Sequence, residues 1–208
     1  MGIPVEIPGL NTLIPEISDG RLVLVESGAD PAKSFFVRRV VLSALAAHRP
    51  VTFVTSRDRD EVRHLLQREG GHPDWEEGAD IREEDSIEDV QRFDSAGGLI
   101  AIDSFSYLTV GLPGPDLARL FRSVRDLCRR DHTIVVLATD RGMFEPRAEA
   151  VAAHLADGVI QFHAKEGPEG LIRYLRIPKW SDGRFVDRNV YYDFDGKRIA
   201  VDLRSRVL

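Results

Sequence analysis

The stretch VESGADPAKSFFVRRVVLSAL, from Val25 to Leu45, decides how this chain folds. It begins in an apolar segment typical of a strand and continues into a long apolar helix pattern, with Lys33 and Ser34 at the junction. A phosphate-binding loop has this arrangement of strand, loop, lysine, hydroxyl and helix. Because the backbone amides at the start of such a helix attract anions, the junction predicts either a working nucleotide site or the remains of one.

The loop departs from the pattern G-x-x-x-x-G-K-S/T at both glycines. Ser27 stands at the first glycine, and Ala32 precedes the lysine, where close backbone approach favours glycine. Asp30 places a carboxylate where a triphosphate would lie, and like charges repel in a confined site. If phosphate binding is retained, the loop residues that hold it are Ser27, Gly28, Ala32, Lys33 and Ser34.

Outside this junction, short apolar runs alternate with helical patterns. The runs are rich in β-branched and aliphatic residues, as in strands buried on both faces of a parallel sheet, and they occupy residues 21–26, 51–55, 98–103 and 133–139. The segments between them have helical spacing. Repeated strand–helix–strand units predict an α/β fold: a mostly parallel sheet with helices on both faces.

The pattern changes near residue 157, where strand patterns follow one another with turns too short for a helix. Consecutive strands joined in this way pair antiparallel. We expect the strands at 171–178 and 189–194 to pair with each other and to adjoin the core sheet. All 208 residues are predicted to form one domain, with a parallel core over 1–156 and antiparallel strands over 157–208.

Composition bounds the class of function. Hydrophobic residues at 43% and charged residues at 30% describe a globular protein. A net charge of -6 argues against broad nucleic-acid binding, which needs a concentrated cationic surface, although a local basic patch stays open. The one cysteine, Cys128, lies at helical spacing from Leu120 and Val124 and is predicted to be a buried structural thiol. Without a signal sequence or a long apolar run, we expect a cytoplasmic protein that contacts no membrane.

An acidic segment lies between the second and third predicted core strands, with nine acidic residues from Asp74 to Asp89. Charge-rich segments of this kind are typical of a solvated loop and helix face. A divalent-metal site is the alternative, but the segment has no EF-hand spacing.

The predicted third core strand ends in Asp103. An acidic residue at the carboxyl end of a parallel strand lies where α/β sheets bind ligands. Beside the hydroxyl of Ser34, such a carboxylate holds Mg²⁺ directly or through water. We therefore predict Ser34 and Asp103 as metal ligands, on condition that a nucleotide binds.

These motifs together resemble KaiC-like proteins and archaeal RadA paralogues of the RecA superfamily. The stretch IPGLNTLIPEISDGRLVLVESGADPAKS is similar to the opening of that family, and LIAIDSFSYL to its second acidic motif. The segment at 156–185 looks like its C-terminal strand and hairpin. The resemblance covers nearly the whole chain and implies a RecA-like fold. In the opening, the family's positions are held by Gly9, Leu10, Leu13, Ile14 and Gly20.

The resemblance also exposes departures. Relatives carry one or two glutamates after the second core strand that activate the attacking water, and here those positions fall within 56–58. A serine or arginine cannot serve as a general base near neutral pH, so Asp58 or Asp60 is the candidate substitute. The polar residue that senses the terminal phosphate in relatives is matched by Thr139 or Asp140.

The hairpin near the C-terminus is the predicted subunit interface. Lys179 matches a lysine that relatives direct at the neighbouring subunit's nucleotide, and Ser181 or Arg184 stands for its companion base. Exposed Trp180 and Phe185 near the tip, beside arginine, suit a protein interface. The alternative is that both rings fold back on their own domain. The interface version implies a homo-oligomer or a hetero-complex with a related ATPase.

The converging changes at the phosphate end predict a regulatory or scaffolding member of the family that does not hydrolyse ATP and requires no cofactor. The alternative is an ATP-binding, weakly active Mg²⁺-dependent ATPase that acts in DNA recombination or repair or as a motor accessory. The acidic balance and the lack of a separate DNA-binding domain oppose the DNA version.

Overall fold

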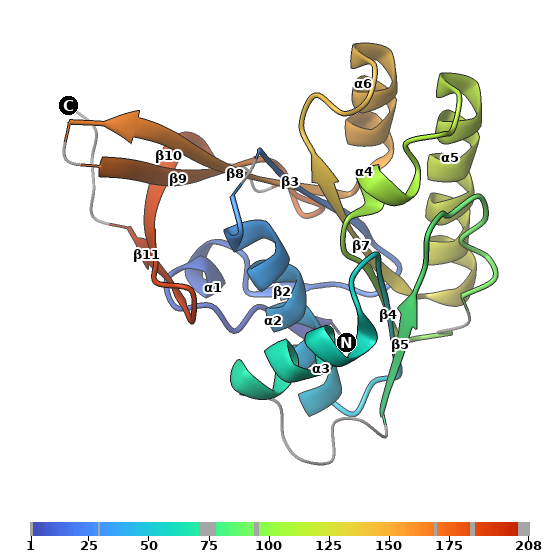
Figure 1. Ribbon diagram of the computed structural model, residues 1–208, viewed down its shortest axis with the longest axis horizontal. Helices are drawn as coiled ribbons and strands as arrows, with labels where there is room; N and C mark the ends of the chain where they lie inside the picture. The colour runs from blue at the N-terminus through green and yellow to red at the C-terminus, as the bar shows by residue number, and fades with distance from the viewer. Residues whose placement is uncertain are drawn as a thin grey trace.

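A nine-stranded sheet runs through the molecule (Figure 1). The computed structural model describes residues 2–28, 30–70, 78–93, 96–168, 170–183 and 186–203. The strands of this sheet are β3 (Leu22–Ser27), β4 (Val51–Thr55), β5 (Ala79–Glu83), β6 (Leu99–Ile102), β7 (Ile134–Asp140), β8 (Gly158–Gly167), β9 (Gly170–Lys179), β10 (Val186–Phe194) and β11 (Ile199–Asp202). Their spatial order is β11-β10-β9-β8-β3-β7-β6-β4-β5.

Helices cover both faces of the sheet, as the sequence predicts (Figure 1). They are α2 (Ala32–Ala46) and α3 (Arg59–Arg68) on one face, and the short α4 (Phe105–Leu108), α5 (Gly114–Asp131) and α6 (Pro146–Leu155) on the other. Strand β3 shows the division. Val23 and Val25 join the apolar core with α2 and α3. Leu22 and Leu24 join the core with α5 and α6, because successive side chains of a strand point to opposite faces.

The parallel and antiparallel parts of the sheet meet at β8. Strands β3, β7, β6, β4 and β5 pair parallel, and β8 pairs parallel with β3 on one side and antiparallel with β9 on the other. Leu175 of β9 lies opposite Val190 of β10 in an antiparallel pair, which confirms the predicted pairing of 171–178 with 189–194. The predicted mostly parallel α/β sheet with an antiparallel C-terminal end is confirmed, and β8 belongs to both parts.

The acidic segment contributes a strand that the sequence did not predict. Strand β5 pairs parallel with β4 at the edge of the sheet, and Ile81 at its centre is buried. On the exposed side Arg82 pairs with Asp80 at 2.7 Å, so charge protects the edge from further pairing. The expectation of a loop and helix face is wrong for these residues. Within the described part of the chain, no three metal-ligating side chains come together, and Asp74, Glu76 and Glu77 lie outside it.

Helix α2 buries most of its side chains because other parts of the chain cover most of its sides. The first residues form β1 (Ile3–Pro4), α1 (Leu10–Leu13) and β2 (Glu16–Ile17), and their buried side chains pack into the same core as α2. Two charged residues of α2 are buried, Lys33 and Arg38, and Arg38 makes a bidentate ion pair with Glu69 at 2.7 Å and 3.0 Å. A buried charge requires such a partner, so this pair joins α2 to the end of α3.

Cys128 is buried in the core beneath α5, as the sequence predicts. Burial raises the pKa of its thiol to about 12, so the thiolate is not formed near neutral pH. Among the described residues, no helix combines the length and the apolar character that crossing a membrane requires.

Candidate functional site

The predicted phosphate loop lies where the parallel strands end. Strand β3 ends at Ser27 and helix α2 begins at Ala32. The neighbouring strands β7 and β6 end at the same edge of the sheet, because they run parallel to β3 and to each other. They bring Asp140 and Asp103 to the start of α2, so four residues predicted from far-apart segments meet here: Lys33, Ser34, Asp103 and Asp140.

The ammonium group of Lys33 is already neutralised by the chain. Its Nζ donates a hydrogen bond to Asp140 Oδ1 at 2.5 Å, and the lysine side chain is only 7% exposed. Asp140 is held in turn, because its backbone N–H donates to Ser106 Oγ at 2.7 Å. Of the two residues that the sequence matched to the phosphate sensor, Asp140 meets the lysine, whereas Thr139 lies opposite Glu26 in the strand pairing.

Asp30 takes the position of an anion at the start of helix α2. Its Oδ1 accepts the backbone N–H of Ala32 at 2.8 Å, the first amide of the helix. Its Oδ2 accepts the hydroxyl of Tyr192 at 3.1 Å and lies 3.4 Å from Arg173 Nε. With its side chain 2% exposed, Asp30 is a buried carboxylate whose hydrogen bonds the chain itself satisfies. Burial, and then the charge of Asp30, raise the pKa of Tyr192.

Arg173 and Tyr192 come from β9 and β10, in the antiparallel end of the sheet, and sequence reasoning missed both. Their side chains face the loop because Leu175 and Val190, whose side chains belong to the same core cluster as α2, lie two residues away on the same strands. The only signal in the sequence was Asp30, a carboxylate in an apolar junction that requires partners once buried.

The hydroxyl and the carboxylate that the sequence predicted as Mg²⁺ ligands are in contact. Ser34 Oγ donates to Asp103 Oδ1 at 2.9 Å. Asp103 is buried at the end of β6, and the next residue, Ser104, has a left-handed backbone (φ 64°) that turns the chain into α4. A hydroxyl beside a carboxylate is a donor set that suits Mg²⁺. The Ser34–Asp103 pair therefore fits a metal ion. The other two phosphate-binding donors, the ammonium of Lys33 and the first helix amide, are already bound by Asp140 and Asp30.

The candidate general base Asp58 has a structural role. It precedes α3, and its Oδ1 accepts the backbone N–H groups of Asp60 and Glu61 at 2.9 Å and 3.0 Å, which is the geometry of a helix N-cap. Asp60, the other candidate, pairs with Arg63 at 2.9 Å on the surface of α3.

A cleft of about 600 Å³ opens beside the loop, toward β8. Its polar wall includes Arg141, whose Nη1 lies 2.9 Å from His163 Nδ1. Burial, and then the nearby charges of Arg141 and Arg176, lower the pKa of His163. Next to the cleft, Glu26 accepts a hydrogen bond from Gln161 at 2.8 Å, and burial raises the pKa of this carboxyl.

Two of the predicted interface residues of the hairpin, Lys179 and Trp180, are held within the domain. Lys179 Nζ donates to the carbonyl oxygens of Ala153 and His154 at 3.1 Å and 2.9 Å, so it caps the end of α6. Trp180 is 7% exposed and lies on Gly158, where a Cβ atom would be 2.6 Å from the ring. The prediction that Trp180 is exposed is wrong, because this glycine leaves room for the ring over β8. Arg184 and Phe185 lie outside the described residues.

Solved structures that share the fold include the following two proteins. The KaiC-like protein PH0186 from the hyperthermophilic archaeon Pyrococcus horikoshii OT3 has a TM-score of 0.77 and 19% sequence identity, over 97% of this chain and 99% of that one. The flagellar accessory protein FlaH from Methanocaldococcus jannaschii has a TM-score of 0.76 and 15% identity, over 97% of this chain and 98% of that one. At these identities the likeness shows the fold, which is the predicted RecA-like α/β fold.

Comparison with curated proteins gives no match. The family whose model matches the sequence is described as a family of unknown function (DUF7125), and the match extends over residues 17–207. That range includes the phosphate-loop junction, the Ser34–Asp103 pair and the antiparallel strands that hold Asp30. The chain therefore belongs to DUF7125.

Proposed function

We propose that this protein is a KaiC-like member of the RecA superfamily with a degenerate phosphate site, and that it acts as a regulatory or scaffolding subunit that does not hydrolyse ATP. One observation carries the proposal: two carboxylates of the chain hold the donors that phosphate groups use in a working loop. Asp30 accepts the amide of Ala32, and Asp140 accepts the ammonium of Lys33. A triphosphate does not fit these residues as they stand, because it must displace both carboxylates.

The magnitude of the repulsion supports this proposal. Two like unit charges about 4 Å apart interact by roughly 4 kcal/mol at an effective dielectric constant of about 20. A phosphate group placed against either carboxylate meets a repulsion of that order, which corresponds to roughly a thousandfold loss in affinity. Asp30 and Asp140 are each already paired with a cation, Arg173 and Lys33, so a phosphate also competes for charges that are in use.

A second candidate function rests on the Ser34–Asp103 pair, which keeps the donor set for Mg²⁺. In that version the protein binds Mg-ATP and is a weakly active ATPase in DNA recombination or repair, or a motor accessory. The lack of a glutamate after β4 and the capping role of Asp58 count against turnover, since general-base loss costs roughly 10²–10⁴ in rate.

Phosphate release with Mg-ATP separates the two candidates. We expect the wild type to release phosphate at the background rate and Lys33→Ala to leave that rate unchanged. The double variant Asp30→Asn/Asp140→Asn should improve nucleotide affinity, because it removes both opposing charges. Asp80→Asn on the edge strand β5 is the matched control and should change nothing. Robust turnover that Lys33→Ala abolishes would contradict the proposal.

The subunit contacts of the proposed role are best supported by exposed apolar side chains at the phosphate edge. Tyr107 and Val110 follow β6, Met143 follows β7, and they are 58%, 65% and 43% exposed. Exposed aromatic and aliphatic groups gathered beside a site are typical of protein interfaces. We propose that this edge, rather than Trp180, forms a homo-oligomer or a hetero-complex with a related ATPase.

Light scattering tests the homomeric version. The wild type should form an oligomer, and Tyr107→Ala/Val110→Ser should shift it toward monomer, with Leu171→Ser, an exposed apolar side chain of β9, as the matched control. A wild-type monomer at high concentration would leave only the hetero-complex. An oligomer unchanged in the double variant would place the interface elsewhere.

A further inference from the structure

Helices α5 and α6 pack side by side on one face of the sheet (Figure 1). A cleft of about 590 Å³ opens at their first turns, and its floor includes the small apolar side chains of Ala118 and Val151. Arg119 and Arg122 line it from α5, and Arg147 lines it from α6. The cleft shares no lining residue with the cleft beside the phosphate loop, so it is a separate feature of the surface.

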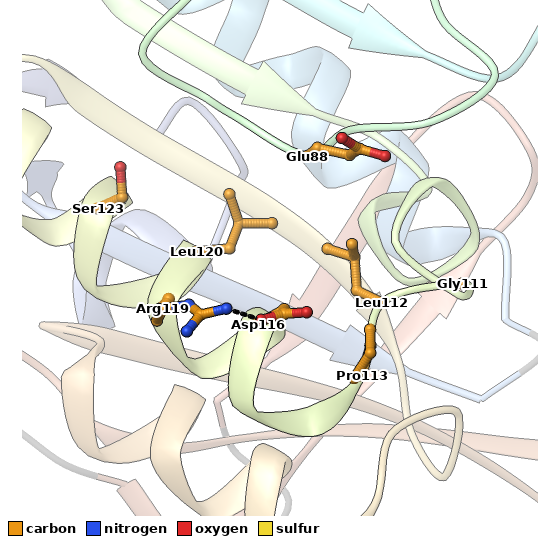
Figure 2. A pocket seen from close by; sticks show the side chains of 8 residues that line it. All are labelled: Glu88, Gly111, Leu112, Pro113, Asp116, Arg119, Leu120 and Ser123. Atoms are coloured by element: carbon orange, nitrogen blue, oxygen red, sulfur yellow. Dashed lines mark hydrogen bonds and ion pairs between the residues drawn. The ribbon is translucent and has the colours of Figure 1, made fainter.

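Two of these arginines form no ion pair with the described residues. Arg119 forms an ion pair with Asp116 on its own helix, at the border of a neighbouring hollow (Figure 2). Neither Arg122 nor Arg147 has a hydrogen bond or an ion pair with any residue in the described part of the chain. The cleft therefore holds two guanidinium groups without an ion pair among the described residues. The single acidic residue in the lining is Glu145.

The positive charge extends along α5. Arg125 and Arg129 follow Arg122 at spacings of three and seven residues, which places all three on one side of the helix. The Nε of Arg125 is buried and has no hydrogen-bond partner among the described residues. Asp126 lies among them and offsets one of these charges, so the side of the helix next to the cleft keeps a net positive charge that favours an approaching anion.

The chemistry of the lining selects the ligand. A guanidinium group presents a planar fork of donors that matches the oxygens of a phosphate group, and arginine is preferred over lysine where such recognition is needed. The volume of the cleft is in the range of small-molecule sites. We propose that the α5–α6 cleft binds a small phosphate-bearing ligand, held between Arg122 of α5 and Arg147 of α6. This site is independent of the proposed function of the phosphate loop.

Calorimetric titration with inorganic pyrophosphate at low ionic strength tests the proposal. The wild type should bind, and Arg122→Ala/Arg147→Ala should weaken binding by at least about tenfold, because each arginine supplies charge-assisted hydrogen bonds. Glu145→Gln should strengthen binding several-fold, since it removes the one opposing charge in the lining. Arg63→Ala, an exposed arginine on α3 at the other face of the sheet, is the matched control and should leave binding unchanged.

Lys33→Ala separates this site from the phosphate loop and should also leave pyrophosphate binding unchanged. The proposal is overturned if the wild type binds no pyrophosphate, or if the double arginine variant binds it fully. Binding that only Lys33→Ala abolishes would overturn it as well, and would count against the degenerate-site proposal too. A thymidine oligonucleotide is the competing ligand. If it binds through Arg122 and Arg147 and pyrophosphate does not displace it, the small-ligand proposal is overturned and the site binds a nucleic-acid backbone.

Discussion

Replacing Asp30 tests whether the chain's own carboxylate holds the phosphate-loop junction together, because this carboxylate contacts three groups. It accepts the amide of Ala32 and the hydroxyl of Tyr192, and it lies 3.4 Å from Arg173. Asp30→Ala leaves all three without a partner. Each buried donor left unsatisfied, the amide and the hydroxyl, costs about 1–3 kcal/mol, and the ion pair adds about 1 kcal/mol, so we expect a loss of roughly 3–5 kcal/mol in the free energy of unfolding.

Asp30→Asn separates hydrogen bonding from charge. Its Oδ1 still accepts the amide of Ala32, and its Nδ2 donates to the oxygen of Tyr192, so only the ion pair with Arg173 is lost. That arginine is 24% exposed, which limits the loss to about 1 kcal/mol. In a cycle with Tyr192→Phe, Asp30→Ala should show a coupling energy of about 1 kcal/mol.

Urea unfolding followed by fluorescence and circular dichroism measures these free energies. A loss below about 1 kcal/mol for Asp30→Ala would refute the reasoning, because a carboxylate with buried partners cannot be removed so cheaply. A loss equal in Asp30→Ala and Asp30→Asn would also refute it, by assigning the whole effect to charge.

Three further predictions concern other parts of the molecule. Trp180→Ala should lower the free energy of unfolding by about 3–5 kcal/mol, seen in urea melts, because the ring fills the space over β8. Glu69→Ala should cost about 3–5 kcal/mol in the same assay, since it leaves Arg38 buried without its partner, whereas Glu61→Ala on the exposed face of α3 should cost little. The pKa of Cys128 rises from 9.0 to about 12 on folding, so between pH 9 and pH 12 the unfolded chain binds fewer protons than the folded one. The free energy of unfolding should therefore fall by about 1.4 kcal/mol per pH unit from pH 9 toward pH 12. In Cys128→Ala the same pH titration of urea melts should show a less steep fall.

The sheet was predictable because buried strands and helices each have a recognisable pattern of apolar residues in the sequence. Continuous apolar runs gave the parallel strands, and the loss of helical spacing after residue 157 predicted the antiparallel end. The edge strand β5 was missed because only Ile81 of its residues is buried, so a charged edge has almost no apolar pattern. Trp180 was misplaced because its burial depends on Gly158, a residue that pairs with it only in three dimensions.

The residues of the candidate site that follow the ends of parallel strands were predictable from the sequence. The residues that reach it from the antiparallel strands β9 and β10 were not. Ser34 and Asp103 lie at the start of a helix and the end of a parallel strand, positions that meet at the carboxyl edge of such a sheet. Arg173 lies far along the chain from Asp30, on strand β9 in the antiparallel end of the sheet. No local pattern in the sequence indicates which distant side chain will contact a buried carboxylate. The contacts of Asp30 with Arg173 and Tyr192 could therefore be found only in the folded chain.

Titration calorimetry with Mg-ATP tests the central claim most directly. The account predicts no saturable binding by the wild type up to about 1 mM nucleotide. A variant that combines Ser27→Gly, Ala32→Gly, Asp30→Asn and Asp140→Asn should bind at least about tenfold more tightly, because it restores backbone freedom and removes both opposing carboxylates. Micromolar binding by the wild type that is lost in Lys33→Ala would contradict the account.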